Sequence, residues 1–96
     1  MVTTLELARA LDQGSSFYRV HDIDLIRYDD GSTDVVVHLE LPAGRRAGHW
    51  RVTLPHAAGE AYIRDPIDLD ETVSMLTVAL DEWEAGAAKL HAERLT

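Results

Sequence analysis

The sequence predicts an α+β domain of two layers, in which a four-stranded antiparallel meander sheet carries two helices on one face. Segments with a helical spacing of apolar residues lie near both ends of the chain, and four segments of alternating apolar and polar residues lie between them. Short connections join these four segments, which favours antiparallel neighbours. The 96 residues fit a single domain, 1–96, with the element order α-β-β-β-β-α.

The first helix is predicted to begin at a capping box. Thr3 is a suitable N-cap, and Glu6 stands three residues later, where its side chain can reach back to the cap. Gly14 is a natural end for the helix. The apolar residues expected on or beside its buried side are Leu5, Leu7, Ala8 and Leu11.

Residues 17–28 are predicted to form the first strand, with an irregularity in its middle. The alternation changes phase at His21–Asp22, where a β-bulge or a break would bring both halves of the strand to the same face. A hairpin turn follows at 29–32. The residues expected to face inward are Tyr18, Val20, Ile23 and Leu25.

Three further strands are predicted, at 33–41, 49–54 and 60–64. The loop 42–48 connects the first two of them, and a short turn precedes the last. Each segment alternates in the way that is typical of a sheet with one buried face. The residues expected to face inward are Val35, Val37, Leu39, Leu41, Trp50, Val52, Leu54, Ala61 and Ile63.

The second helix is predicted to begin after Pro66, with Asp68 as its N-cap. Its apolar residues recur at spacings of three and four, which is typical of an amphipathic helix. Gly86 is either the C-cap or a weak point before a further turn or two that end near Arg94. The apolar stripe consists of Leu69, Val73, Leu76, Leu80 and Trp83.

Composition limits the cellular setting and the partners. The chain has no cysteine, which excludes disulfides and thiolate metal sites. Small secreted domains often carry disulfides and the N-terminus shows no signal-peptide pattern, so we expect a cytoplasmic protein. No apolar run is long enough to span a membrane. Seventeen acidic residues against nine basic ones argue against direct nucleic-acid binding. They favour either a basic partner or a surface that only maintains solubility.

The loop between the second and third strands places Arg45 and Arg46 between two glycines. Its glycine spacing is not that of a phosphate-binding loop, and a strand rather than a helix follows it. We therefore expect an exposed hairpin tip. The alternative is that Arg45 and Arg46 dock on an acidic group of a partner, or on the acidic helix of a second copy of the chain.

Five histidines raise the question of a metal site. Pairing of Leu39 with Val52 would place His49 opposite Pro42. In that register His49 lies too far along the sheet from His38 for both to bind one zinc ion. Motifs with close spacing, such as HExxH, are absent from the sequence. We therefore expect no metal ion and no other cofactor.

Enzyme signatures are also absent from the sequence. There is no GxSxG motif, the serines have no evident base partner, and nothing indicates that two carboxylates are buried together. We therefore expect a non-enzymatic protein without catalytic residues. The alternative is a small-ligand-binding or catalytic domain with a pocket between the second helix and the sheet.

Two surfaces are candidates for binding a partner. The second helix ends with three acidic residues where its dipole disfavours negative charge, so a basic partner is one explanation for them. The outer face of the sheet combines apolar with charged residues, which is typical of an interface. Together with the loop arginines, the candidate partner-binding residues are Ile26, Tyr28, Val36, His38, Tyr62, Arg45, Arg46, Asp81, Glu82 and Glu84.

These observations predict a small acidic cytoplasmic protein that acts through protein–protein contacts. An immunity protein, an antitoxin or another inhibitor-type protein fits this description by general class. A homodimer that forms through the outer face or a free sheet edge is a variant of the same hypothesis.

Overall fold

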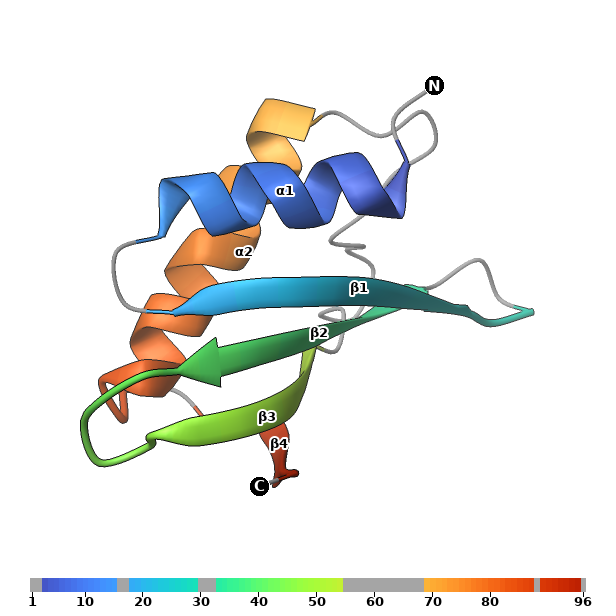
Figure 1. Cartoon of the computed structure of the whole chain (residues 1–96). Coiled ribbons are helices and arrows are strands. Elements are labelled where there is room, and N and C mark those ends of the chain that lie inside the picture. The colour runs from blue at the N-terminus through green and yellow to red at the C-terminus, as the bar shows by residue number, and fades with distance from the viewer. Residues whose placement is uncertain (1–2, 16–17, 30–32, 55–68, 88, 96) are drawn as a thin grey trace.

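Two helices pack on one face of a four-stranded antiparallel sheet in the computed structural model (Figure 1), which confirms the predicted two-layer α+β class. The strands lie side by side in the order β1-β2-β3-β4. The elements are α1 (Thr4–Gly14), β1 (Arg19–Arg27), β2 (Thr33–Leu41), β3 (Gly48–Leu54), α2 (Leu69–Glu84) and β4 (His91–Arg94). The structure describes residues 3–15, 18–29, 33–54, 69–87 and 89–95.

The fourth strand of this sheet is not the one that the sequence predicts. The predicted strand at 60–64 lies outside the described residues. Among the described elements the fourth strand is β4, which follows α2 and pairs with β3. The described elements therefore run α-β-β-β-α-β along the chain, in place of the predicted order.

Gly86 is the reason that α2 ends before β4. Its φ angle is 80°, in the left-handed region that glycine adopts without strain. The Ala87 N–H donates to the Glu82 carbonyl at 2.8 Å, and the Gly86 N–H donates to the Trp83 carbonyl at 3.1 Å. This is a Schellman-type C-cap. Of the two alternatives for Gly86, the C-cap is confirmed, and the continuation of the helix toward Arg94 is wrong.

The N-terminal helix is capped as predicted, but the side that it buries differs slightly from the predicted one. The Thr3 hydroxyl accepts a hydrogen bond from the Glu6 N–H at 3.2 Å. The helix buries Leu7, Ala8 and Leu11, whereas Leu5 is exposed. Leu7 therefore takes the place in the core that the sequence suggested for Leu5.

The first strand contains the predicted bulge. The register between β1 and β2 shifts between Val20 and Asp22, which leaves His21 as the extra residue. Because of this shift, Val20 and Ile23 are both buried although they lie on opposite sides of the alternation. The bulge thus keeps both halves of β1 in contact with the core.

The register between β2 and β3 differs from the predicted one by two residues. Leu39 pairs with Trp50 and Glu40 pairs with His49. The connecting loop is closed by its own hydrogen bonds, since the Trp50 Nε1–H donates to the Arg46 carbonyl at 2.7 Å. A shift of two residues leaves every side chain on its predicted face but changes its neighbours across the strands.

The core ends in a column of aromatic and cationic side chains beside the C-terminal end of α2. The Trp50 and Trp83 rings meet edge to face with centroids 5.3 Å apart. The Arg46 guanidinium lies 4.7 Å from the Trp83 ring centroid, and that of Arg94 lies 4.8 Å from the Trp50 centroid. Trp83 is buried as predicted, whereas Trp50 is only half-buried. This column joins α2, β3, β4 and the loop 42–47.

Candidate functional site

The outer face of the sheet, which points away from the helices, concentrates the histidines of the chain. Successive residues of a strand point to opposite faces, so the inward apolar residues alternate with outward polar ones. No helix or strand among the described residues covers this face. Four of the five histidines lie on it: His21, His38, His49 and His91.

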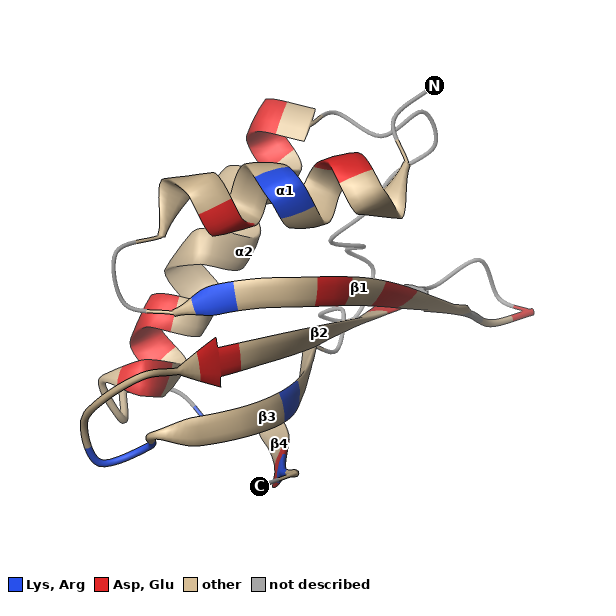
Figure 2. Ribbon diagram, in the orientation of Figure 1, with Lys and Arg blue, Asp and Glu red and all other residues tan. Residues whose placement is uncertain are grey.

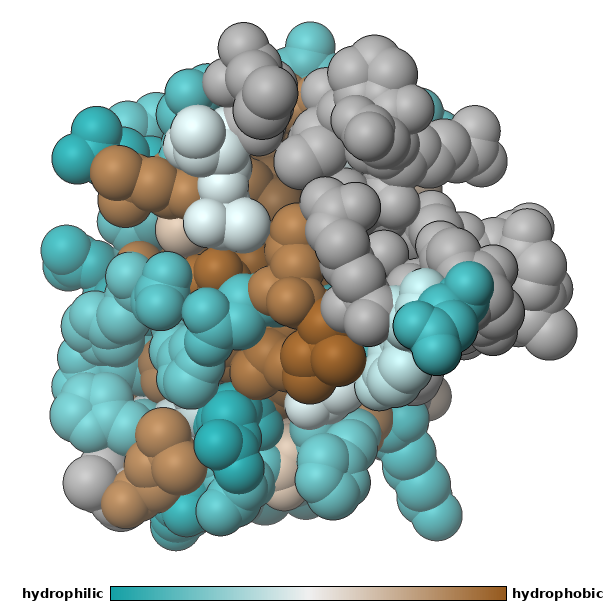
Figure 3. All heavy atoms as spheres, turned by 90° about the vertical axis from the view of Figure 1, so that its right-hand side faces the viewer, coloured by the Kyte–Doolittle hydropathy of each residue, from teal (hydrophilic) through white to brown (hydrophobic). Residues whose placement is uncertain are grey.

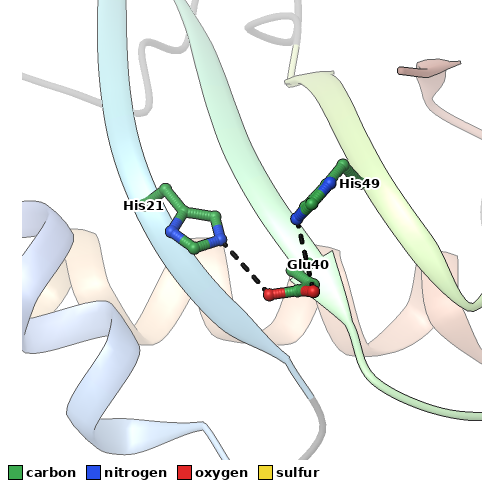
Figure 4. A group of neighbouring side chains, drawn as sticks. All are labelled: His21, Glu40 and His49. Carbon is green, nitrogen blue, oxygen red and sulfur yellow. Dashed lines mark ion pairs between the residues drawn. The ribbon is translucent and has the colours of Figure 1, made fainter. Parts of the chain in front are cut away.

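Two of these histidines converge on one carboxylate. The β2–β3 register places His49 opposite Glu40, and the bulge in β1 places His21 on the other side of the same carboxylate. The His21 Nε2 atom lies 3.5 Å from Glu40 Oε1, and the His49 Nε2 atom lies 3.3 Å from Glu40 Oε2 (Figure 4). The two imidazole rings meet edge to face with centroids 5.8 Å apart.

These three side chains are the only ones in the described part of the chain whose metal-ligating atoms converge in this way. One ligand atom from each residue can be chosen so that all three atoms lie within 4.8 Å of one another. All three side chains are about half-exposed to solvent. Imidazole nitrogen and carboxylate oxygen are ligands that suit zinc and neighbouring transition metals. We call this group the His21–Glu40–His49 cluster.

Two further pairs of charged or polar residues lie on the outer face. The His38 Nε2 atom lies 3.1 Å from Asp24 Oδ2, so this ion pair joins β1 to β2. Arg51 on β3 hydrogen-bonds Glu93 on β4. Histidines and arginine therefore alternate with carboxylates across the strands, which limits the repulsion among the acidic residues of this face.

An apolar area lies beside these polar pairs. Ile26 and Tyr28 are 45% and 46% exposed, and they are large side chains for such positions. The side of the molecule that corresponds to the right-hand side of Figure 1 shows hydrophobic side chains gathered between hydrophilic ones (Figure 3). A hollow of about 360 Å³ opens next to Ile26. It is lined by Asp24, Ile26, Val36, His38, Arg51, Thr53 and His91.

Only part of the predicted interface is brought together here. Ile26, Val36 and His38 line the same hollow. Val36 is only 7% exposed, so the expectation that it forms an exposed patch with Ile26 is wrong. Tyr28 lies near the same end of the sheet, and its hydroxyl donates to Asp34 at 2.8 Å. Tyr62 lies outside the described residues.

The Arg45–Arg46 loop lies apart from this hollow and against the chain's own helix. The Arg46 side chain is half-buried on Trp83, so the expectation of a wholly exposed hairpin tip is wrong for this residue. Arg45 is exposed and passes near Gly86 at the end of α2. The two arginines therefore hold different positions, since one packs on the core and the other faces solvent.

The acidic end of α2 forms a separate surface (Figure 2). Asp81 and Glu82 are exposed, and Glu84 is half-buried. A hollow of about 440 Å³ runs along the same helix. Its lining consists of Ser74, Met75, Val78, Ala79 and Glu82.

Asp81 also influences a buried tyrosine. Burial raises the pKa of Tyr18 to about 12, and the negative charge of Asp81 adds to this increase. The Tyr18 hydroxyl is enclosed and has no hydrogen bond of good geometry among the described residues. This tyrosine therefore favours the protonated form in the folded protein.

The sequence did not predict the His21–Glu40–His49 cluster, because the assumed register placed His49 opposite Pro42. The predicted bulge at His21–Asp22 was a usable signal, since a bulge redirects side chains. Comparison of the chain with protein-family models, curated proteins and solved structures found no match. The function must therefore be argued from the geometry.

Proposed function

We propose that this protein is a non-enzymatic binding protein, and that the outer face of its sheet docks a partner protein with a basic surface. The observation that carries the proposal is the exposed pair Ile26 and Tyr28 beside the hollow at Val36. A sheet with one solvated face usually presents polar residues on it. An apolar area with a charged rim is more typical of an interface.

The charge of the same face supports the basic character of the partner. By strand register, the described part of the face carries five carboxylates and two arginines. The whole chain has a net charge of -8. Such a surface attracts a basic protein during diffusion and repels nucleic acid. The carboxylates are Asp22, Asp24, Asp34, Glu40 and Glu93, and the arginines are Arg19 and Arg51.

The class of inhibitor-type proteins, which includes immunity proteins and antitoxins, agrees with this proposal. Such proteins act by occupying a partner's surface and need no catalytic residues. A cytoplasmic setting agrees with the absence of cysteine. A second copy of the chain is the competing occupant of the same face, because β1 and β4 are the edge strands of the sheet and no described element covers its outer face.

The experiment compares two variants that place the same charge on different surfaces. Ile26→Asp alters the outer face, where Ile26 is 45% exposed, and Val78→Asp alters an apolar position on α2 that is 58% exposed. Immobilised wild-type and variant chains are exposed to an extract of the cells that produce the protein. Captured proteins are identified, and association with the purified partner is then measured at rising salt concentration.

We expect the wild type and Val78→Asp to capture the same basic protein, and Ile26→Asp to lose it. Association should slow as salt rises, because screening weakens attraction between exposed charges. Loss of capture only in Val78→Asp would move the site to α2 and overturn the proposal. A wild-type dimer in sedimentation that Ile26→Asp dissociates, with no other protein captured, would show that the occupant is a second copy.

A further inference from the structure

We infer that His21, Glu40 and His49 form a binding site for a divalent transition-metal ion, with Zn²⁺ as the ion that fits best. The two imidazole nitrogens and the carboxylate come from three neighbouring strands, so the sheet itself holds them together. This inference does not rest on the proposed partner, because none of the three residues lines the hollow beside Ile26.

The distances in the cluster approach those around a tetrahedral zinc ion, and the two shortest involve different oxygens of Glu40. Zinc binds nitrogen and oxygen at about 2.0–2.2 Å, so two ligands of a tetrahedral site lie roughly 3.3–3.5 Å apart. The observed separations are 3.5 Å from His21 Nε2 to Glu40 Oε1 and 3.3 Å from His49 Nε2 to Glu40 Oε2. The widest separation among the chosen ligand atoms is at most 4.8 Å. Small rotations of these half-exposed side chains are enough to bring the three ligand atoms to tetrahedral separations.

The donor atoms of the cluster also suit a metal ion. Glu40 presents one carboxylate oxygen to each of two imidazoles. A divalent cation uses the lone pairs of two neutral imidazoles together with the carboxylate. The arrangement therefore satisfies all three side chains at once when the cation is bound.

The site has an open side toward solvent. Three protein ligands leave one position of a tetrahedral ion for water, which is the pattern of zinc sites that exchange a ligand. Figure 4 shows the Glu40 carboxylate between the two histidines, with one oxygen toward each ring. The chemical class of ligand is thus a borderline cation such as Zn²⁺, and Mg²⁺ and Ca²⁺ are disfavoured because they prefer oxygen ligands.

The test is a Zn²⁺ titration of the purified full chain against a chromophoric chelator. We expect one Zn²⁺ to bind per chain, with weaker binding as the pH falls and protons compete for the imidazoles. His49→Gln and Glu40→Gln should each weaken binding roughly tenfold or more, since each removes one of three ligands. His38→Gln is the matched control: it changes another histidine–carboxylate pair on the same face and should leave the affinity unchanged.

Folding of each variant is checked by its urea unfolding midpoint, which should stay close to that of the wild type because the cluster is half-exposed. Zn²⁺ should raise this midpoint for the wild type and for His38→Gln but not for His49→Gln. Absence of binding by the wild type at millimolar Zn²⁺ would overturn the inference. Equal affinity of the wild type, His49→Gln and Glu40→Gln would overturn it as well, because the ion would then be bound elsewhere.

Discussion

The inward and outward side chains of β2 lie in different environments. Its inward residues Val35, Val37 and Leu39 are almost completely buried among the helices and their neighbouring strands. The outward residues between and beyond them include His38 and Glu40, which form ion pairs with β1 and β3. The inner face stabilises the fold through apolar contact, whereas the outer face presents ion pairs that are partly exposed to solvent.

This contrast indicates where substitutions should affect stability and where they should affect binding. Burial of apolar area is worth about 25 cal/mol per Å², so inner-face side chains dominate the free energy of unfolding. Exposed ion pairs contribute about 0–1 kcal/mol, so the exposed charged residues of the outer face can change with little loss of the fold. Under the proposed function, the acidic residues and histidines of the outer face contribute to binding rather than to stability.

The largest loss of stability is expected for Trp83→Ala. Trp83 is buried, packs edge to face on Trp50 and carries the Arg46 guanidinium on its ring. Removal of such a side chain costs about 3–5 kcal/mol. Urea unfolding measures the change. A loss below about 1 kcal/mol, as is usual for surface positions, would contradict the place of Trp83 in the core.

The next effect concerns Tyr18 and alkaline pH. Its pKa rises from 10.0 to about 12 on folding, mainly through burial, so the folded state holds the phenol proton more tightly than the unfolded chain does. This contribution to stability is complete below the unfolded pKa and is lost as pH rises through the folded pKa. The loss is on the order of 2–3 kcal/mol, since each pKa unit corresponds to about 1.4 kcal/mol.

Urea unfolding between neutral pH and pH about 12 measures this loss, with Tyr18→Phe as the variant that should not show it. Tyr28→Phe is the control, because Tyr28 is exposed. An equal alkaline loss in the wild type and in Tyr18→Phe would show that other groups cause it.

A smaller loss of stability is expected when a loop arginine is replaced, and the loss should differ between Arg45 and Arg46. Arg46→Ala removes a half-buried guanidinium from the Trp83 ring and should cost about 1–2 kcal/mol. Arg45→Ala changes an exposed side chain and should stay within about 0.5 kcal/mol. Thermal or urea unfolding of both variants tests the difference. Equal effects would show that the loop does not distinguish its two arginines.

The smallest effect is expected on the outer face. Arg51→Ala breaks the ion pair with Glu93, and both side chains are about half-exposed. The cost should stay below about 1 kcal/mol, because solvent screens such pairs. A loss of stability close to that of Trp83→Ala would contradict the expected difference between the inner and outer faces.

The general architecture of the domain could be predicted from the sequence because it depends on periodicity and capping. The alternation in β2 and β3 identified the inner face, and the change of phase at His21–Asp22 identified the bulge. Both are local signals, since a strand repeats every two residues. The cap at Thr3 is equally local.

The register between β2 and β3 and the strand at 91–94 could not be predicted, because both depend on contacts between distant segments. Two registers of β2 on β3 that differ by two residues place the same side chains on the same face, so periodicity cannot choose between them. The choice decides whether Glu40 meets Arg51 or His49. The role of 91–94 as a strand likewise depends on pairing with β3, because four residues carry too weak a pattern.

The most direct test of the account is a map of where Zn²⁺ acts on the protein in solution. In a ¹H–¹³C and ¹H–¹⁵N NMR titration, each histidine ring and each backbone amide reports separately. We predict that the first changes occur at His21 and His49 and at the amides around Glu40, and that His38, His91 and the acidic end of α2 change little. Changes that begin at Asp81 and Glu82, or that spread evenly over all histidines, would contradict the claim that the outer face carries a built site.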